Sequence, residues 1–246
     1  MANGPKILSL DIETSPVVAH AWGLFKQNIA ISQILERPRT MCFGAKFLDQ
    51  RKVHFYSEFH HEPDVMYHAV HALLDEADVV MSYNGDRFDL PRLNTEFVLM
   101  GLTPPSPYKS IDLLKVMRSN FAFPSNKLAY VSEQLGLAGK VKHEGHSLWI
   151  RCLAGDPKAW AIMKKYNIQD VKLLEEMYEK LKPWIKAHPH VGLYSGETDC
   201  CPNCGSLELE RRGYVVKTTG KYQRYRCRTC GTWPSATRRV SGVNIA

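Results

Sequence analysis

Two spacings of apolar residues cover most of the chain up to residue 181. Apolar and polar residues alternate in short runs, as in strands, and apolar residues recur every three or four positions in longer runs, as in helices. These patterns predict strands at 8–15, 41–48, 52–56, 79–83 and 108–114, and helices opening at Pro63, near Pro91, over 127–137 and over 157–181. The order predicts an α/β fold, a mixed sheet flanked by helices. Residues 16–39 give no clear prediction.

The strand at 8–15 carries two acids, Asp11 and Glu13. They project from one face, because successive side chains of a strand alternate, and the pattern predicts that the strand is half-buried. Two carboxylates this close repel each other unless a cation lies between them, which favours a divalent metal site. A pair of solvated acids on an exposed strand face explains this strand equally well, so residues elsewhere must decide.

Two further acids lie where a ligand could be held. Asp89 follows the strand at 79–83 and lies at or close to the N-cap of the next helix, and helix capping is its alternative role. Asp170 interrupts the apolar stripe of the helix over 157–181, where an unpaired carboxylate is costly. Tyr166 lies one turn before Asp170, so the two side chains can reach one site. The alternative is a helix rotated enough to leave Asp170 in solvent.

The C-terminal part contains four cysteines in two CxxC pairs: Cys201, Cys204, Cys227 and Cys230. Each pair can form a tight knuckle whose thiolates supply half of a tetrahedral Zn²⁺ site. The spacing therefore predicts a zinc ribbon with one Zn²⁺ at 199–246, after a linker at 185–198. The three remaining cysteines are expected to stay reduced.

The formal net charge of +7 lies mostly in this tail. Residues 191–246 contain nine Lys and Arg against four Asp and Glu, whereas the first 190 residues are nearly balanced. Tyr222, Arg224 and Arg226 interleave a ring with cations, as on a surface that stacks bases and neutralises phosphates. This predicts a polyanionic partner, and the alternative is a structural ribbon with a solvated basic face.

Hydropathy argues against a membrane protein. No apolar run approaches the roughly 18 residues of a membrane span, and the first residues lack the apolar core of a secretory signal. We therefore expect no membrane partner and a cytoplasmic location.

Four acids and one tyrosine resemble, in order and spacing, the DEDDy branch of the DnaQ-like exonucleases: Asp11, Glu13, Asp89, Tyr166 and Asp170. Residues 84–93 are similar to the exonuclease domains of family B polymerases and their stand-alone relatives. The resemblance implies an RNase H-like fold over 1–184, two Mg²⁺ or Mn²⁺ ions held by the four acids, and a water-orienting role for Tyr166. It places substrate contacts at Thr14, Asn84 and Phe88. Lys127 is either a phosphate contact or a solvated lysine.

The sequence thus predicts a metal-dependent 3′–5′ exonuclease that acts on DNA at single-stranded ends. A replication or repair protein supplied in trans is compatible with this. One alternative keeps the fold and makes the substrate RNA or a structured junction that is cut internally. The other is a nucleic-acid-binding adaptor whose nuclease domain is inert.

Overall fold

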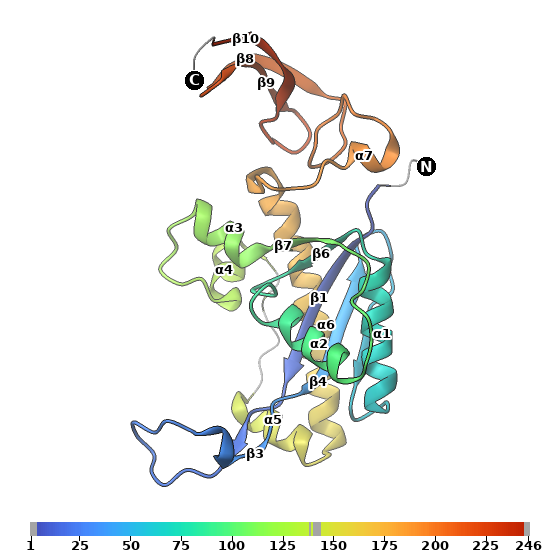
Figure 1. Cartoon of the computed structure of the whole chain (residues 1–246), viewed down its shortest axis with the longest axis vertical. Helices are drawn as coiled ribbons and strands as arrows, with labels where there is room; N and C mark the ends of the chain where they lie inside the picture. Colours follow the sequence, from blue (N-terminus) through green and yellow to red (C-terminus); the bar gives the residue numbers. More distant parts are fainter. Residues whose placement is uncertain (1–3, 138, 140–143, 244–246) are drawn as a thin grey trace. The chain divides into compact units, whose positions relative to one another are not determined.

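The computed structural model describes residues 4–137, 139 and 144–243. These residues form two compact units (Figure 1). One, which we call the sheet unit, comprises Lys6–Leu114 and Phe123–Glu176. The other, the cysteine unit, is built mainly from Lys115–Ala122 and the chain from Met177 onward. The domain limits of 1–184 and 199–246 stay predictions.

Five strands form the mixed sheet of the sheet unit, in the order β5-β4-β1-β6-β7. Their bounds are β1 Ile7–Thr14, β4 Thr40–Phe47, β5 His54–Ser57, β6 Val79–Ser82 and β7 Lys109–Asp112. Strands β1, β6 and β7 are parallel, whereas β4 and β5 run antiparallel to their neighbours. The central position of β1 places the strand with Asp11 and Glu13 in the middle of the sheet.

Helices cover both faces of this sheet. Leu8, Leu10 and Ile12 of β1 pack into one core with apolar residues of α1 (Pro63–Glu76) and α2 (Asp89–Leu99). On the other face a second core joins Met41 and Cys42 of β4 to α5 (His146–Leu153) and α6 (Pro157–Leu181). The prediction of a half-buried β1 holds for its second half, where Asp11 and Glu13 are only partly buried, whereas Ser9 in the first half is as buried as Leu8 and Leu10.

The remaining helices are α3 Leu113–Asn120, α4 Leu128–Gln134, α7 Gly192–Ser195 and the 3-10 turns Ile31–Gln33 and Lys182–Trp184. Helix α6 begins at the predicted Pro157 and ends at Leu181, close to where its end was predicted. Helix α5 and the two short strands β2 (Val18–Ala19) and β3 (Ile34–Glu36) were not predicted.

The cysteine unit carries a three-stranded antiparallel sheet in the order β10-β9-β8. Its strands are β8 Leu209–Lys217, β9 Gly220–Cys227 and β10 Ser235–Gly242. Across the described part of the chain, the helices are too short or too polar to span a bilayer.

Candidate active site and metal centre

Asp11 lies on the face of β1 that α6 covers. The Asn167 side-chain amide of α6 donates hydrogen bonds of 2.8 Å to the Asp11 carboxylate and 3.2 Å to its backbone carbonyl. One turn further along α6, the Val171 carbonyl accepts a 3.1 Å hydrogen bond from the Ser9 hydroxyl. Asn167 was not predicted as a site residue, although it lies on the same stripe of α6 as Asp170. These bonds fix α6 against the acidic end of β1.

A glycine permits this close approach. Gly44 of β4 pairs with Asp11 in the sheet register. A Cβ atom at Gly44 would lie 2.4 Å from Asn167 Oδ1 and 2.9 Å from Val171 Cγ2, closer than real Cβ atoms come. Only glycine therefore lets Asn167 reach Asp11 at this distance.

Asp89 reaches β1 from the opposite side. It is the first residue of α2, and the N-cap is Phe88, which makes no side-chain cap. The Asp89 carboxylate instead accepts a 3.0 Å hydrogen bond from the Ile12 backbone amide, between Asp11 and Glu13 in the chain. Helix capping is therefore not the principal role of this carboxylate.

The turn before α2 is fixed by a buried acid that was not predicted. Asn84 adopts a left-handed conformation, with φ of 71°, which asparagine tolerates better than most residues. Its backbone amide donates a 2.9 Å hydrogen bond to the carboxylate of Asp112, at the end of β7. Asp86 accepts a hydrogen bond from the Ser110 hydroxyl of the same strand. Two acids of this region thus hold the turn that positions Asp89.

Tyr166 and Asp170 both project from α6 toward the sheet and are buried. Burial raises the pKa of the Tyr166 phenol far above its usual range, and the negative charges of Asp170, Glu13 and Asp11 raise it further. The phenol also hydrogen-bonds to Asp170. The structure therefore brings Tyr166 into the field of three of the predicted acids, and a solvated Asp170 is excluded.

The donor set of this site fits a hard divalent cation. Burial, together with the charge of Asp112, raises the pKa of Asp89 to about 7. A carboxylate with this pKa is only partly ionised at neutral pH, and a cation beside it would favour the ionised form. Oxygen donors are the ligands that Mg²⁺ and Mn²⁺ prefer.

The four acids are not gathered as tightly as ligands of a single ion. Among the described residues, only the four cysteines place three or more metal-binding side-chain atoms within 4.8 Å of one another, and the acids do not. A two-ion site of the kind that the DEDDy resemblance implies would need a ligand set wider than that of one ion.

The predicted substrate contacts lie at different places. Thr14 ends β1 beside a bulge in its pairing with β4. Phe88 is partly exposed, with the Arg92 guanidinium 5.8 Å from its ring centroid. Lys127 is exposed at the N-cap of α4.

The second metal centre is formed by the four predicted cysteines. The Sγ atoms of Cys201 and Cys230 lie 3.6 Å apart, and those of Cys204 and Cys227 lie 3.7 Å apart. A zinc tetrahedron with Zn–S bonds of about 2.3 Å has sulfur–sulfur edges of about 3.8 Å, whereas a disulfide measures about 2.05 Å. The cluster therefore has the dimensions of a four-thiolate metal site.

The two knuckles have matching backbones. In the first, the Gly205 amide donates to the Cys201 carbonyl at 2.8 Å, and in the second the Gly231 amide donates to the Cys227 carbonyl at 3.0 Å. Both glycines have positive φ, 75° and 83°, a conformation that favours glycine. The repeated CxxCG sequence thus encodes two equivalent half-sites.

The sheet beside this centre pairs cations with rings. Arg224 and Arg226 lie on one face of β9, and their guanidinium carbons are 5.1 and 6.0 Å from the centroid of Trp233. The Lys217 side-chain nitrogen lies 4.9 Å from the ring centroid of Tyr222 on the neighbouring strand. Trp233 was not predicted as part of this surface. Its position three residues after Cys230 was the sequence feature that could have indicated it.

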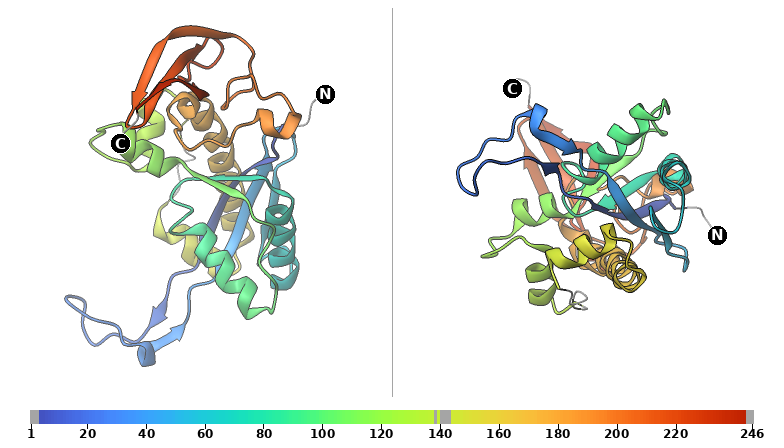
Figure 2. Two further views of the ribbon diagram at one scale, coloured as in Figure 1. Left: turned by 45° about the horizontal axis from the view of Figure 1, so that its top comes forward. Right: turned by 90° about the horizontal axis from the view of Figure 1, so that it is seen from below.

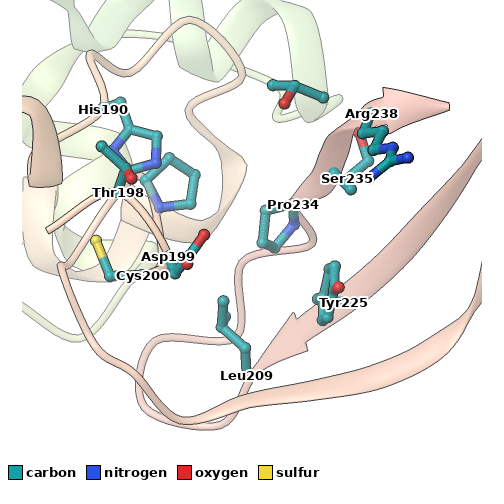
Figure 3. Close-up of a pocket in the computed structure, with 12 residues that line it drawn as sticks. His190, Thr198, Asp199, Cys200, Leu209, Tyr225, Pro234, Ser235 and Arg238 are labelled. Carbon is teal, nitrogen blue, oxygen red and sulfur yellow. The ribbon is translucent and has the colours of Figure 1, made fainter.

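A groove of about 510 Å³ lies within the cysteine unit (Figure 3). Tyr225 of β9 and Arg238 of β10 line one side of it, and His190 and Asp199 line the other. An aromatic ring and a guanidinium in one groove are suited to a nucleotide, which presents a flat base and an anionic phosphate.

Residues 35–182 match the sequence model of the RNase H superfamily. The chain belongs to the RNase H superfamily. Membership supports a nuclease, a nucleic-acid substrate and the use of divalent metal ions. The matched span includes Asp89, Tyr166 and Asp170 but begins after β1. Asp11 and Glu13 are assigned to the site by their contacts and electrostatic interactions with residues of α6.

Among the solved structures with a similar fold, a DNA polymerase matches most of this chain. It is the family B DNA polymerase from the hyperthermophilic archaeon Pyrobaculum calidifontis, with a TM-score of 0.58 and 15% sequence identity. The match covers 88% of this chain and 32% of the polymerase chain. No curated protein matches the sequence. The predicted fold and resemblance are confirmed at the level of the superfamily.

Proposed function

We propose that the protein is a metal-dependent 3′–5′ exonuclease that hydrolyses phosphodiester bonds at single-stranded DNA ends. The observation that carries this proposal is the convergence on β1 of buried acidic groups from α2 and α6, with the Tyr166 phenol in the field of Asp11, Glu13 and Asp170. Superfamily membership supports the reaction class. The 3′–5′ direction and the preference for DNA over RNA rest on the resemblance to the DEDDy exonucleases.

Each residue has a defined role in this proposal. Asp11, Glu13, Asp89 and Asp170 hold two Mg²⁺ or Mn²⁺ ions, which when bound activate the nucleophile and stabilise the leaving oxygen. Asn167 and the Ile12 amide orient the Asp11 and Asp89 carboxylates. Thr14, Asn84, Phe88 and Lys127 contact the 3′-terminal nucleotides.

Tyr166 orients the attacking water by hydrogen bonding, because its raised pKa excludes a phenolate at neutral pH. Tyr166→Phe should lower kcat about ten- to a thousandfold, the cost of one positioned hydrogen bond in a transition state. Affinity for Mn²⁺, followed by titration, should not change. Tyr67→Phe, which alters a buried tyrosine with only a 3.5 Å hydrogen bond to Thr40, is the control. Loss of Mn²⁺ affinity in Tyr166→Phe would move the phenol into the ligand set.

The ribbon, with Zn²⁺ on its four cysteines, aids nucleic-acid binding through Tyr222, Arg224 and Arg226. Each phosphate contact on a single strand contributes about −0.7 to the slope of log affinity against log salt. Replacing both Arg224 and Arg226 with Gln should therefore make the slope less negative by up to about 1.4. Arg51 and Lys52, both exposed in the sheet unit, give the control with the same loss of charge. Equal slopes for the two double variants would remove the ribbon arginines from the interface.

The substrate class is tested with one sequence presented as single-stranded DNA, duplex DNA and RNA, each with Mg²⁺, with Mn²⁺ and without divalent metal. The proposal expects metal-dependent hydrolysis that is fastest on single-stranded DNA. Faster hydrolysis of RNA, or one internal cut in a structured substrate, would favour the alternative nuclease. Binding without hydrolysis in any condition would favour the inert adaptor.

A further inference from the structure

An arm leaves the sheet unit directly after β1. We define it as residues 16–39, which include the antiparallel pair β2–β3 and the loop between these strands (Figure 2). Two guanidinium groups fix its base. Arg37 forms a bidentate pair with Glu96 of α2, and Arg39 forms one with Glu58 at 2.7 and 3.2 Å. The arm therefore projects from an anchored base.

The loop of the arm exposes large apolar side chains. Trp22 and Leu24 are each 92% exposed, Ile31 is 87% exposed and Phe25 is 84% exposed. Single exposed apolar residues are common on protein surfaces, but a cluster of this kind marks an interaction site. The arm contacts too little of its own unit to bury these side chains.

Charge and chemistry favour a nucleic acid as the occupant. Between Pro16 and Leu35 the sequence contains no acidic residue. Lys26 lies beside Phe25 at the exposed tip, and within the described residues it has no ion pair. Rings next to an unpaired cation are the means by which proteins hold single strands, with the rings on bases and the cation on phosphate.

Chain continuity ties the arm to the acidic site. Trp22 follows Thr14 by eight residues, so it lies no farther than about 28 Å from the end of β1. A stacked strand rises about 3.4 Å per nucleotide, so about eight nucleotides reach from the acids to the farthest position open to Trp22. A single strand of about eight nucleotides, with its 3′ end at the carboxylates, is therefore long enough to reach Trp22.

We propose that Trp22 and Phe25 stack on unpaired bases of the substrate strand a few nucleotides before its 3′ end. This inference rests on the proposed function for its placement of the 3′ end. The stacked bases hold the strand in line with the acids, and a duplex end must open before its bases reach the rings. The arm thus adds a preference for single strands longer than a few nucleotides.

The test measures binding and hydrolysis separately in the full chain. Binding of a fluorescent 20-nucleotide single-stranded DNA is followed in the Asp11→Asn background, with and without Trp22→Ala and Phe25→Ala. Each ring should contribute about 5- to 150-fold to affinity, so the variant that lacks both rings should bind at least about 25-fold more weakly. Leu24→Ala, which removes an equally exposed side chain without a ring, is the matched control and should change affinity less than twofold.

Hydrolysis is followed with Asp11 intact. A trinucleotide spans only about 10 Å when stacked, so the proposal expects it to be cleaved at the same rate by the wild type and the two-ring variant. The 20-nucleotide strand should show a raised KM with the variant. Equal affinity of the variant and wild type for the long strand would overturn the proposal. So would sedimentation showing a wild-type dimer that the ring substitutions convert to a monomer. If the wild type hydrolyses nothing but the binding difference persists, the function fails and the stacking site stands.

Discussion

Asp11→Asn should abolish metal-dependent hydrolysis while leaving the fold intact. Asparagine keeps the shape of the side chain and can still accept the hydrogen bond from Asn167, so the packing of α6 against β1 is preserved. The substitution removes a negative ligand from the proposed two-ion site, which is worth several kcal/mol of transition-state stabilisation, and the rate should fall by about a thousandfold or more.

The matched control for this variant is Asp86→Asn. Asp86 lies in the turn before α2, three residues from Asp89, but its carboxylate bonds to the Ser110 hydroxyl, an acceptor role that asparagine can fill. Turnover and thermal unfolding are measured on both proteins. Asp11→Asn with activity within threefold of the wild type would remove Asp11 from the site.

Gly44→Ala should impair both stability and activity although it changes no candidate ligand. The added Cβ would meet Asn167 Oδ1 at 2.4 Å, and Asn167 is fully buried and cannot swing away. Overpacking of this kind costs about 1–3 kcal/mol of unfolding free energy. Moving α6 from β1 also shifts Asp170 and Tyr166, and a 1 Å displacement of a catalytic group can cost about a hundredfold in rate.

Gly139→Ala is the matched control, because none of the described residues lies within 4 Å of a Cβ there and its backbone is not left-handed. Denaturant unfolding gives the stability change, and turnover on a single-stranded oligonucleotide gives the rate. A Gly44→Ala protein with wild-type stability and turnover would mean that close packing of α6 on the sheet is not what positions the acids.

The parts of the structure visible in the sequence are those set by periodicity and by metal-ligand spacing. Helix α6 was predictable because its apolar stripe is long, and Asp170 stood out because an acid interrupts that stripe. The cysteine cluster was predictable because CxxC spacing leaves few geometries open. Local patterns therefore gave the fold class and the candidate ligands.

Features that depend on contacts between distant segments were not visible in the same way. The hydrogen bond from the Ile12 amide to Asp89 joins residues 77 positions apart, so local sequence could suggest only a helix cap. The need for glycine at position 44 arises from α6, more than a hundred residues later. The arm was unassigned because its apolar residues follow no period, being exposed instead of packed.

The central claim is most directly tested by the products formed from a 5′-labelled single-stranded DNA with Mg²⁺. We predict a ladder of labelled fragments that shorten one nucleotide at a time from the 3′ end, absent without divalent metal and stopped by a hydrolysis-resistant linkage at the 3′ terminus. Early release of the label as a mononucleotide, a single internal cut, or no metal-dependent product would contradict a 3′–5′ exonuclease.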